Sequence, residues 1–310
     1  MRLDDYRNSD NVSDQGRGGG GMGFGGGGGG GGMFGLLFGL VLSRFGIGGV
    51  LILLLGYCAL SMFGGGGGLG VSGPGTAVAP HEAGAAGKSA QEVCASDPAK
   101  GFSCRVLANT EDTWTRIFEA QGQRYQPAGF SFYTGGGTSG CGAAQSAMGP
   151  FYCPTDNKIY LDTSFYGELQ NKFGAAGDFA QAYVIAHEVG HHIQNLTGVL
   201  AKARQQQGRV SSREGNAVQV RVELQADCYA GVYAANAKDR QGRPVLEPGD
   251  VQEGLTAAAA IGDDTLQQQT QGRVRPESFT HGSAAQRQAW LKRGLDSGDP
   301  AACDTFGGAV

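Results

Sequence analysis

The sequence predicts an α+β domain, mainly helical with a small antiparallel hairpin, behind one N-terminal transmembrane helix. Apolar residues recur at three- and four-residue steps over residues 178–197, 216–231 and 283–295, which is the period of an amphipathic helix. Two short β-rich runs, 151–153 and 158–162, flank a Pro-Thr-Asp-Asn turn and predict the hairpin. The uninterrupted apolar run 46–63 is about long enough to cross a bilayer.

The first 92 residues divide by composition into three segments. Residues 1–32 are polar and then almost pure glycine, so they can bury little, and we expect a disordered cytoplasmic tail. Residues 33–63 are largely apolar, and we expect a transmembrane signal anchor in the lipid bilayer. Residues 64–92 are rich in Gly, Ala and Pro and predict a flexible linker. The folded domain is then expected over 93–310.

Positive charge is distributed unequally around the apolar run. Four arginines lie at or before its start, and no Lys or Arg follows until Lys88. The positive-inside rule therefore predicts a single-pass protein with a cytoplasmic N-terminus and an extracytoplasmic domain. The run is longer than an ordinary signal-peptide core and no Ala-x-Ala site follows it, so we expect no cleavage.

Cysteine usage agrees with an extracytoplasmic domain. Cys58 lies in the apolar run, and an even set of six cysteines lies downstream, which predicts disulfides. Two separations are short enough to close locally and leave a third pair: Cys94 with Cys104, Cys141 with Cys153, and Cys228 with Cys303. Six cysteines nevertheless allow fifteen connectivities. The alternative is six buried free thiols in a reducing compartment.

The charge pattern excludes one class of partner. The chain carries 24 Lys and Arg against 28 Asp and Glu, a net charge of −4, and has no basic cluster. Because nucleic-acid binding proteins present a basic surface, we expect no nucleic-acid partner. The oligomeric state is left open.

The motif around which the function is predicted is His187-Glu188-x-x-His191. Positions i and i+4 project from one face of a helix, so the imidazoles of His187 and His191 can bind one metal ion. Glu188 can reach a water molecule at that ion and accept its proton without becoming a ligand. Asp178 as N-cap and Gly198 as a C-terminal stop favour a helix here. A chance histidine pair on an amphipathic helix is the alternative.

A second helix offers the third ligand that a catalytic zinc site needs. Glu223 and Asp227 lie four residues apart among apolar neighbours, where unpaired carboxylates would be costly. Glu223 can then bind the metal, while Asp227 accepts the Nδ1 proton of a ligating histidine and fixes its tautomer. The alternative is an exposed pair of acidic residues.

Local signals predict the remaining elements. Thr110 begins a helix that ends at Gly122, and 129–134 alternates as a strand does. Further expectations are a loop at 135–140, a short helix at 164–173, a helix capped by Asp250 and Glu253, and a last helix capped by Ser283 and Gln286.

The order of hairpin, His-Glu-x-x-His helix and Glu-x-x-x-Asp helix resembles the gluzincin branch of the zincin metallopeptidases. Longer strings at 151–154, 158–162, 187–194, 223–231 and 278–283 resemble the YpfJ-like neutral zinc metallopeptidases of bacteria over nearly the whole chain. The resemblance implies a zincin-like fold, one catalytic Zn²⁺, attachment to the bacterial inner membrane with a periplasmic domain, and hydrolysis of peptide or protein substrates. It assigns the zinc to His187, His191 and Glu223, the general base to Glu188, and the orienting role to Asp227.

The same resemblance extends to two further parts of the site. In related gluzincins a later histidine hydrogen-bonds the oxyanion, and His281 is the matching candidate, with a capping role for the final helix as the alternative. In zincins the strand before the metal helix pairs with an extended substrate. This assigns substrate binding to Lys158, Ile159, Tyr160, Leu161 and Asp162. A catalytically weak or inactive zinc-binding scaffold of the same fold is the alternative to an endopeptidase.

Overall fold

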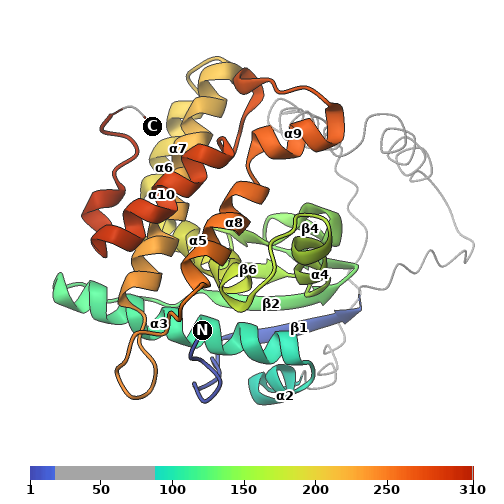
Figure 1. The fold of residues 1–310 in the computed structure, drawn as a ribbon, viewed down its shortest axis with the longest axis vertical. Coiled ribbons are helices and arrows are strands. Elements are labelled where there is room, and N and C mark those ends of the chain that lie inside the picture. The colour runs from blue at the N-terminus through green and yellow to red at the C-terminus, as the bar shows by residue number, and fades with distance from the viewer. Residues whose placement is uncertain (18–87, 309) are drawn as a thin grey trace, which may run out of the picture. The chain divides into compact units, whose positions relative to one another are not determined.

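The computed structural model describes residues 1–17, 88–308 and 310, which belong to one compact unit (Figure 1). The expected membrane anchor at 33–63 and most of the expected linker lie outside the described residues. No helix within the described ranges has the length and apolar character needed to span a bilayer. The folded part of the downstream chain begins slightly before residue 93, because Ser89 caps the first helix after the gap.

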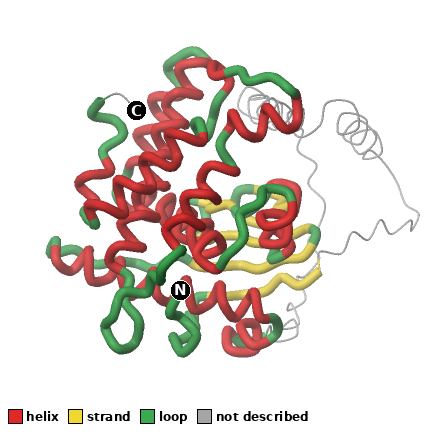
Figure 2. The backbone as a smooth tube through the Cα atoms, viewed as in Figure 1, coloured by secondary structure: helices red, strands yellow, loops and turns green. Residues whose placement is uncertain are grey.

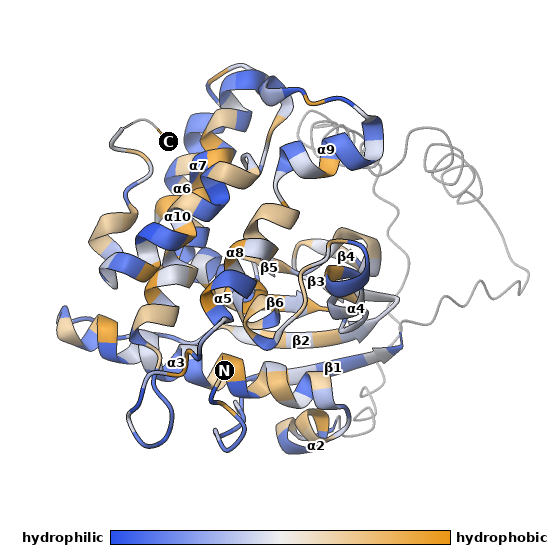
Figure 3. Ribbon diagram, viewed as in Figure 1, coloured by the Kyte–Doolittle hydropathy of each residue, from blue (hydrophilic) through white to orange (hydrophobic). Residues whose placement is uncertain are grey.

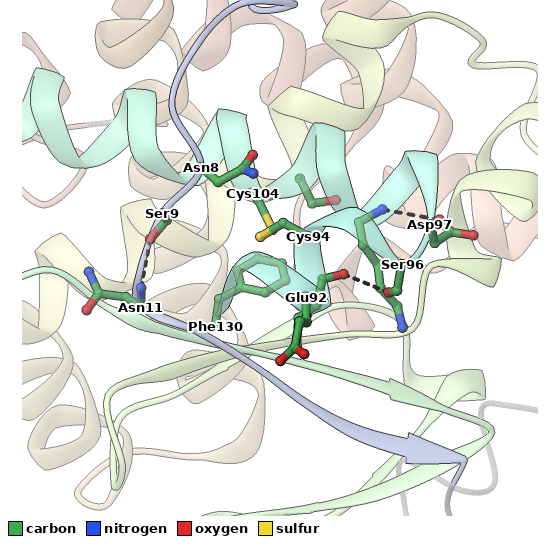
Figure 4. Close-up of a disulfide and its surroundings, with 12 residues drawn as sticks. Asn8, Ser9, Asn11, Glu92, Cys94, Ser96, Asp97, Cys104 and Phe130 are labelled. Atoms are coloured by element: carbon green, nitrogen blue, oxygen red, sulfur yellow. Dashed lines mark hydrogen bonds between the residues drawn. A yellow bond between two sulfur atoms is a disulfide. The ribbon is translucent and has the colours of Figure 1, made fainter. Parts of the chain in front are cut away.

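Residues 1–17 are ordered, which corrects the expectation of a disordered tail for this part of the chain. Strand β1 (Val12–Arg17) pairs in parallel with β2 (Gly129–Thr134), and the Leu3 side chain is buried. In Figure 4 the N-terminal segment passes beside the Cys94–Cys104 disulfide, where the backbone N–H of Ser9 donates to the carbonyl of Cys104 at 3.2 Å. The polar composition concealed this, because the segment docks through strand pairing and through polar side chains such as Ser9 and Asn11, which both donate to Glu111.

The position of this N-terminal segment bears on the expected membrane topology. Strands β1 and β2 pair directly, so residues 12–17 and 129–134 belong to one folded unit. Arg7, one of the four arginines counted on the N-terminal side of the apolar run, belongs to the same unit and forms ion pairs with Glu111 and Asp112. A cytoplasmic N-terminus with an extracytoplasmic domain stays a prediction, and the pairing of β1 with β2 weighs against it.

Helices make up most of the unit, with one small sheet, as expected for the α+β class (Figure 2). The helices are α2 (Ala90–Ala95), α3 (Pro98–Ala120), α4 (Ser164–Asn171), α5 (Asp178–Leu196), α6 (Val199–Gln207), α7 (Ser212–Asn236), α8 (Asp250–Ala260), α9 (Asp263–Gln271) and α10 (Ala284–Ser297). The remaining strands are β3 (Gly136–Ser139), β4 (Gly142–Gln145), β5 (Phe151–Cys153) and β6 (Lys158–Leu161).

The sheet is mixed rather than purely antiparallel. Its order is β4-β3-β2-β6-β5, with β1 paired to β2 in addition. The predicted hairpin is confirmed as β5 and β6, and Asn157 in its turn has a positive φ of 57°. The expected loop at 135–140 is wrong, because β3 and β4 form a second hairpin there. Strand β6 lies between β2 and β5, so β5 stands at one end of the sheet.

Two close helix crossings bring the site together. A Cβ atom added at Gly190 of α5 would lie 2.9 Å from the carbonyl oxygen of Ala226 on α7. At the crossing of α7 and α10, a Cβ at Gly294 would lie only 1.9 Å from the carbonyl oxygen of Cys228. Glycine permits both approaches because it has no side chain. In Figure 1, α7 and α10 accordingly run side by side.

Several helix ends differ from those expected. Asp178 and Asp250 are the first residues of α5 and α8, and glycines occupy the two N-cap positions without a side-chain bond. The backbone N–H of Phe179 instead donates to the Glu253 carboxylate at 3.1 Å, so α8 caps α5. Helix α3 begins at Pro98, well before Thr110. The Ser283–Gln286 capping box of α10 is confirmed.

The six downstream cysteines form the three expected pairs. Disulfides join Cys94 to Cys104, Cys141 to Cys153, and Cys228 to Cys303. The last of these ties α7 to the C-terminal segment. The core between sheet and helices contains Phe130, Leu161 and Tyr183, and Figure 3 shows hydrophobic colour on α5 and β6 in this region.

Candidate metal centre

Helices α5 and α7 bring three metal-binding side chains to one point. His187, His191 and Glu223 each offer a ligand atom, and these atoms lie within 4.8 Å of one another. Oε2 of Glu223 is 3.2 Å from Nε2 of His187 and 3.5 Å from Nε2 of His191. Two imidazole nitrogens and one carboxylate oxygen form the donor set of catalytic zinc sites, which keep a fourth position open. The residues present therefore fit a zinc ion.

The orientation of His187 is set by a buried ionic network. Its Nδ1 lies 2.8 Å from Oδ1 of Asp227, which leaves Nε2 directed toward Glu223. Asp227 also accepts hydrogen bonds from the Tyr183 hydroxyl at 2.6 Å and from Nε and Nη2 of Arg287 at 2.8 and 2.9 Å. Asp227 thus lies where the sequence predicts the orienting residue, beside Nδ1 of His187. Arg287, on α10, was not anticipated.

Electrostatics keep this network charged. Burial alone would raise the pKa of Asp227, but the Arg287 guanidinium and then His187 outweigh it and lower the pKa to about 2. Burial likewise opposes ionisation of Glu223, and the two histidines hold its pKa well below the usual value. Burial lowers the pKa of His187, but the carboxylates of Asp227 and Glu223 outweigh burial and raise the pKa to about 10. The ionised carboxylates of Asp227 and Glu223 therefore favour a positive charge at the site.

His191 is oriented by an uncharged amide. Its Nδ1 lies 2.9 Å from Oε1 of Gln194, one turn further along α5. The Gln194 amide nitrogen donates to the carbonyl of Val222 at 2.7 Å and to the Gln225 side chain at 3.0 Å, so its oxygen is the atom that faces His191. Nε2 of His191 is thereby left for the metal. Gln194 was not predicted from the sequence, although it stands three residues after His191.

The metal centre opens onto a cavity of about 340 Å³. Glu188, His191, Glu223 and His281 line one part of it. The other walls come from the segment around β5 and from α6 and α7: Met148, Pro150, Phe151, Tyr152, Pro154, Leu200, Ala203, Arg204, Gln207, Gln219 and Val222. Glu188 thus shares one cavity with two of the candidate metal ligands.

His281 lies in this cavity and is held by a residue that the sequence analysis missed. Its Nδ1 is 3.2 Å from Oδ1 of Asp263, the first residue of α9. Oδ2 of Asp263 accepts from the backbone N–H groups of Thr280 and His281, both at 2.6 Å. Burial lowers the pKa of His281, but the carboxylates of Asp263 and Glu223 outweigh burial, so the pKa is raised above its ordinary value. Because Ser283 caps α10, His281 is not its cap.

The expected substrate strand is corrected. None of residues 158–162 lines the cavity, and Ile159, Tyr160 and Leu161 are buried within the sheet. Asp162 accepts hydrogen bonds from the backbone N–H of Gly135 and of Ser164, so it organises turns. Strand order causes the difference, because β6 pairs with β2 on one edge and with β5 on the other, which leaves no open edge for a substrate.

Strand β5 is joined to the metal helix through a third histidine. Nε2 of His192 donates to the carbonyl of Gln126 at 2.6 Å, and Nδ1 lies 3.0 Å from the Tyr152 hydroxyl. His192 is therefore a hydrogen-bonded neighbour of the site, as its position after the ligand predicts. Burial lowers its pKa, which favours the neutral imidazole.

Comparisons with known proteins agree with this geometry. A family model described as putative neutral zinc metallopeptidase matches residues 1–306. The chain belongs to this family. It is 56% identical over 214 residues to the uncharacterized protein YpfJ of Escherichia coli, which covers 69% of this chain and 74% of the relative. It is 47% identical over 223 residues to the uncharacterized protein Rv2575 of Mycobacterium tuberculosis, with the same coverage. No solved structure matches.

Proposed function

We propose that this protein is a zinc-dependent endopeptidase that hydrolyses peptide bonds in extended segments of proteins or peptides. The observation that carries the proposal is the convergence of two groups of residues on one cavity. The donors His187, His191 and Glu223 meet at its base, and Glu188 and His281 line the same space. A purely structural zinc site would need no such opening.

Glu188 is the general base of the proposed reaction. A zinc ion held by His187, His191 and Glu223 would supply Lewis-acid chemistry, polarising the scissile carbonyl and acidifying the attacking water. The Glu188 carboxylate removes a proton from that water and delivers it to the leaving amine. Glu188 lines the same cavity as His191 and Glu223 and lies outside the group of candidate ligands.

His281 stabilises the negative charge that develops on the carbonyl oxygen. The Asp263 carboxylate holds its Nδ1 side, which leaves Nε2 to donate to the oxyanion. Because Nδ1–H bonds Asp263, Nε2 donates only when the ring is protonated; burial lowers the pKa of His281, and the Asp263 carboxylate acts in the opposite direction. Backbone bonds from Thr280 and Gly282 to Asp263 fix the loop that carries it.

An extended substrate binds along β5. The strand pairs with β6 on one edge, no strand of the described residues pairs with its other edge, and Phe151 and Tyr152 line the cavity. Main-chain pairing of a substrate with such an edge is tolerant of side chains. The α5 contact through His192 and Tyr152 fixes the strand relative to the metal.

Glu188→Gln tests the catalytic assignment. We expect the variant to retain its zinc and to lose turnover of an unstructured protein by ~10²–10⁴-fold, because the general base is gone. Metal analysis and a proteolysis assay on the zinc-loaded protein measure both quantities. Glu168→Gln, an exposed carboxylate on α4, is the matched control and should change neither. Normal turnover by Glu188→Gln would refute the mechanism, and a zinc-loaded wild type that cleaves nothing would favour the scaffold alternative.

We also propose that the whole folded unit, including residues 1–17, is extracytoplasmic and that residues 33–63 contact the bilayer. The three disulfides support an oxidising compartment. With Cys58 replaced by Ser, the single substitutions Asp10→Cys and Lys172→Cys can be probed with a membrane-impermeant maleimide on spheroplasts. Labelling of both is expected. Labelling of Lys172→Cys alone would contradict the shared compartment, and labelling of neither before lysis would contradict the extracytoplasmic location.

A further inference from the structure

The wall of the cavity formed by α6 and α7 differs in chemistry from the metal side. Its apolar members include Leu200, Ala203 and Val222, and Gln207 and Gln219 add two uncharged amides. Arg204 is the one arginine or lysine among the residues that line this cavity. A wall of apolar and uncharged groups with a single cation can accept a side chain that has an aliphatic stem and a charged end.

The charge of Arg204 is not neutralised by its own surroundings. No ion pair joins it to another of the described residues, whereas acidic partners hold Arg7, Arg243 and Arg287. Helix α6 contains no Asp or Glu. The acidic residues that line the cavity, Glu188 and Glu223, have proposed roles at the metal.

We infer that Arg204 makes this enzyme selective for peptides that carry a glutamate or aspartate side chain close to the scissile bond, on the α6 side of the cavity. The inference rests on the proposed peptidase function and adds the class of substrate to it. The chain as a whole has a net charge of −4, so general electrostatic attraction would not favour acidic peptides. The selectivity must arise locally, from the Arg204 guanidinium.

Peptide binding tests the inference without requiring turnover. The full-length Glu188→Gln protein, loaded with zinc, is titrated with short extended peptides that are identical except for Glu, Gln or Lys scanned through the positions around the bond to be cleaved. At one position, Glu should bind roughly 10-fold more tightly than Lys, with Gln between them, because attraction is replaced by repulsion at a partly solvated site. Added salt should reduce the ratio.

Two charge reversals on α6 separate the local effect from a general one. Arg204→Glu, made in the same background, should invert the preference so that Lys binds more tightly than Glu. Lys202→Glu is the matched control, because it makes the same change of charge two residues away at an exposed position outside the cavity lining. It should leave the ratio of the two affinities nearly unchanged.

The outcomes distinguish this inference from the proposed function. An unchanged ratio in Arg204→Glu overturns the role of Arg204, even if the wild type cleaves peptides. An equal change in Lys202→Glu also overturns it, as does the absence of binding by every peptide. If Arg204→Glu inverts the preference but the wild-type protein cleaves none of the bound peptides, the selectivity stands and the proposed catalysis fails.

Discussion

The two histidines of the metal helix are held in different ways. His187 bonds to a carboxylate that is itself paired with a buried guanidinium, so its support extends from α7 to α10. His191 bonds to the side-chain amide of Gln194, whose other contacts are to Val222 and Gln225 on α7. One support is ionic and reaches across three helices. The other is neutral and involves two.

Because of this difference, the two histidines should respond differently to the loss of a supporting residue. The ionic support depends on every charge in it, because a buried carboxylate without its partner is costly. The hydrogen bonds of the Gln194 amide contribute less to the free energy of folding, and their loss leaves no buried charge without a partner. We therefore expect substitutions to have effects of unequal size at the two histidines.

Replacing Arg287 by Met should have the largest effect. The side chain of Asp227 is completely buried, and loss of its guanidinium partner should destabilise the fold by about 3–5 kcal/mol. Zinc affinity should fall by ~10–100-fold, because Asp227 would no longer be fixed against His187. Denaturant unfolding and competition with a chelator measure the two effects.

A second substitution shows whether charge is the cause. Asp227→Asn combined with Arg287→Met removes both charges and should recover part of the stability lost in Arg287→Met alone. Zinc affinity should remain low in the double variant. If the double variant is as unstable as the sum of the two single variants, the pair is not energetically coupled and the contrast with His191 fails.

Replacing Gln194 by Met should have a smaller effect. The substitution keeps the approximate volume but removes the acceptor for His191 and the donors to Val222 and Gln225. Loss of these buried bonds should cost about 1–3 kcal/mol, with a reduction in zinc affinity of up to ~10-fold. The same two assays apply. A loss of stability that equals or exceeds that of Arg287→Met would contradict the proposed order of the two supports.

The smallest effect on stability is expected at His192, which lies on the same helix as His187 and His191 but is not a predicted metal ligand. Its lowered pKa means that the unfolded chain takes up a proton more readily than the folded one. Its contribution to stability is therefore complete above pH 6.5 and is lost as the pH falls below that value. The pKa values of His187, His191 and His281 are raised, so their contributions change above pH 6.5 instead.

The variant His192→Gln allows this contribution to the pH dependence of stability to be measured. In metal-free protein the wild type should lose stability between pH 6.5 and 5 more steeply than the variant, because Gln does not titrate in this range. The comparison requires denaturant unfolding at several pH values with each protein. Parallel curves for the two proteins would show that His192 does not titrate differently in the folded state.

Sequence alone was sufficient where the site depends on local helical spacing. His187 and His191 are related by one turn of α5, and Glu223 and Asp227 by one turn of α7, so the shared face of each pair could be predicted from residue type and interval. Arg287 and Asp263 could not be found in this way. Each acts through a partner that is distant along the chain, and no local pattern marks the contact.

The errors in the fold have a related cause. The hairpin of β5 and β6 follows from its turn, but which strand faces the metal depends on the parallel pairing of β6 with β2. Residues 1–17 join the sheet through backbone pairing with β2, more than one hundred residues further along the chain. Composition and hydrophobic period carry no information about such long-range pairings.

The placement of Arg287 on α10 has a consequence for biosynthesis. A growing chain contains both histidines, Glu188 and Glu223 before α10 has been made. Until Arg287 arrives, Asp227 lacks the guanidinium that balances its charge in the finished fold. The helix that carries Arg287 crosses α7 at Gly294, and the Cys228–Cys303 disulfide closes just after it. The zinc-binding arrangement is therefore complete only after α10 has been made, because Arg287 follows Asp227 by 60 residues.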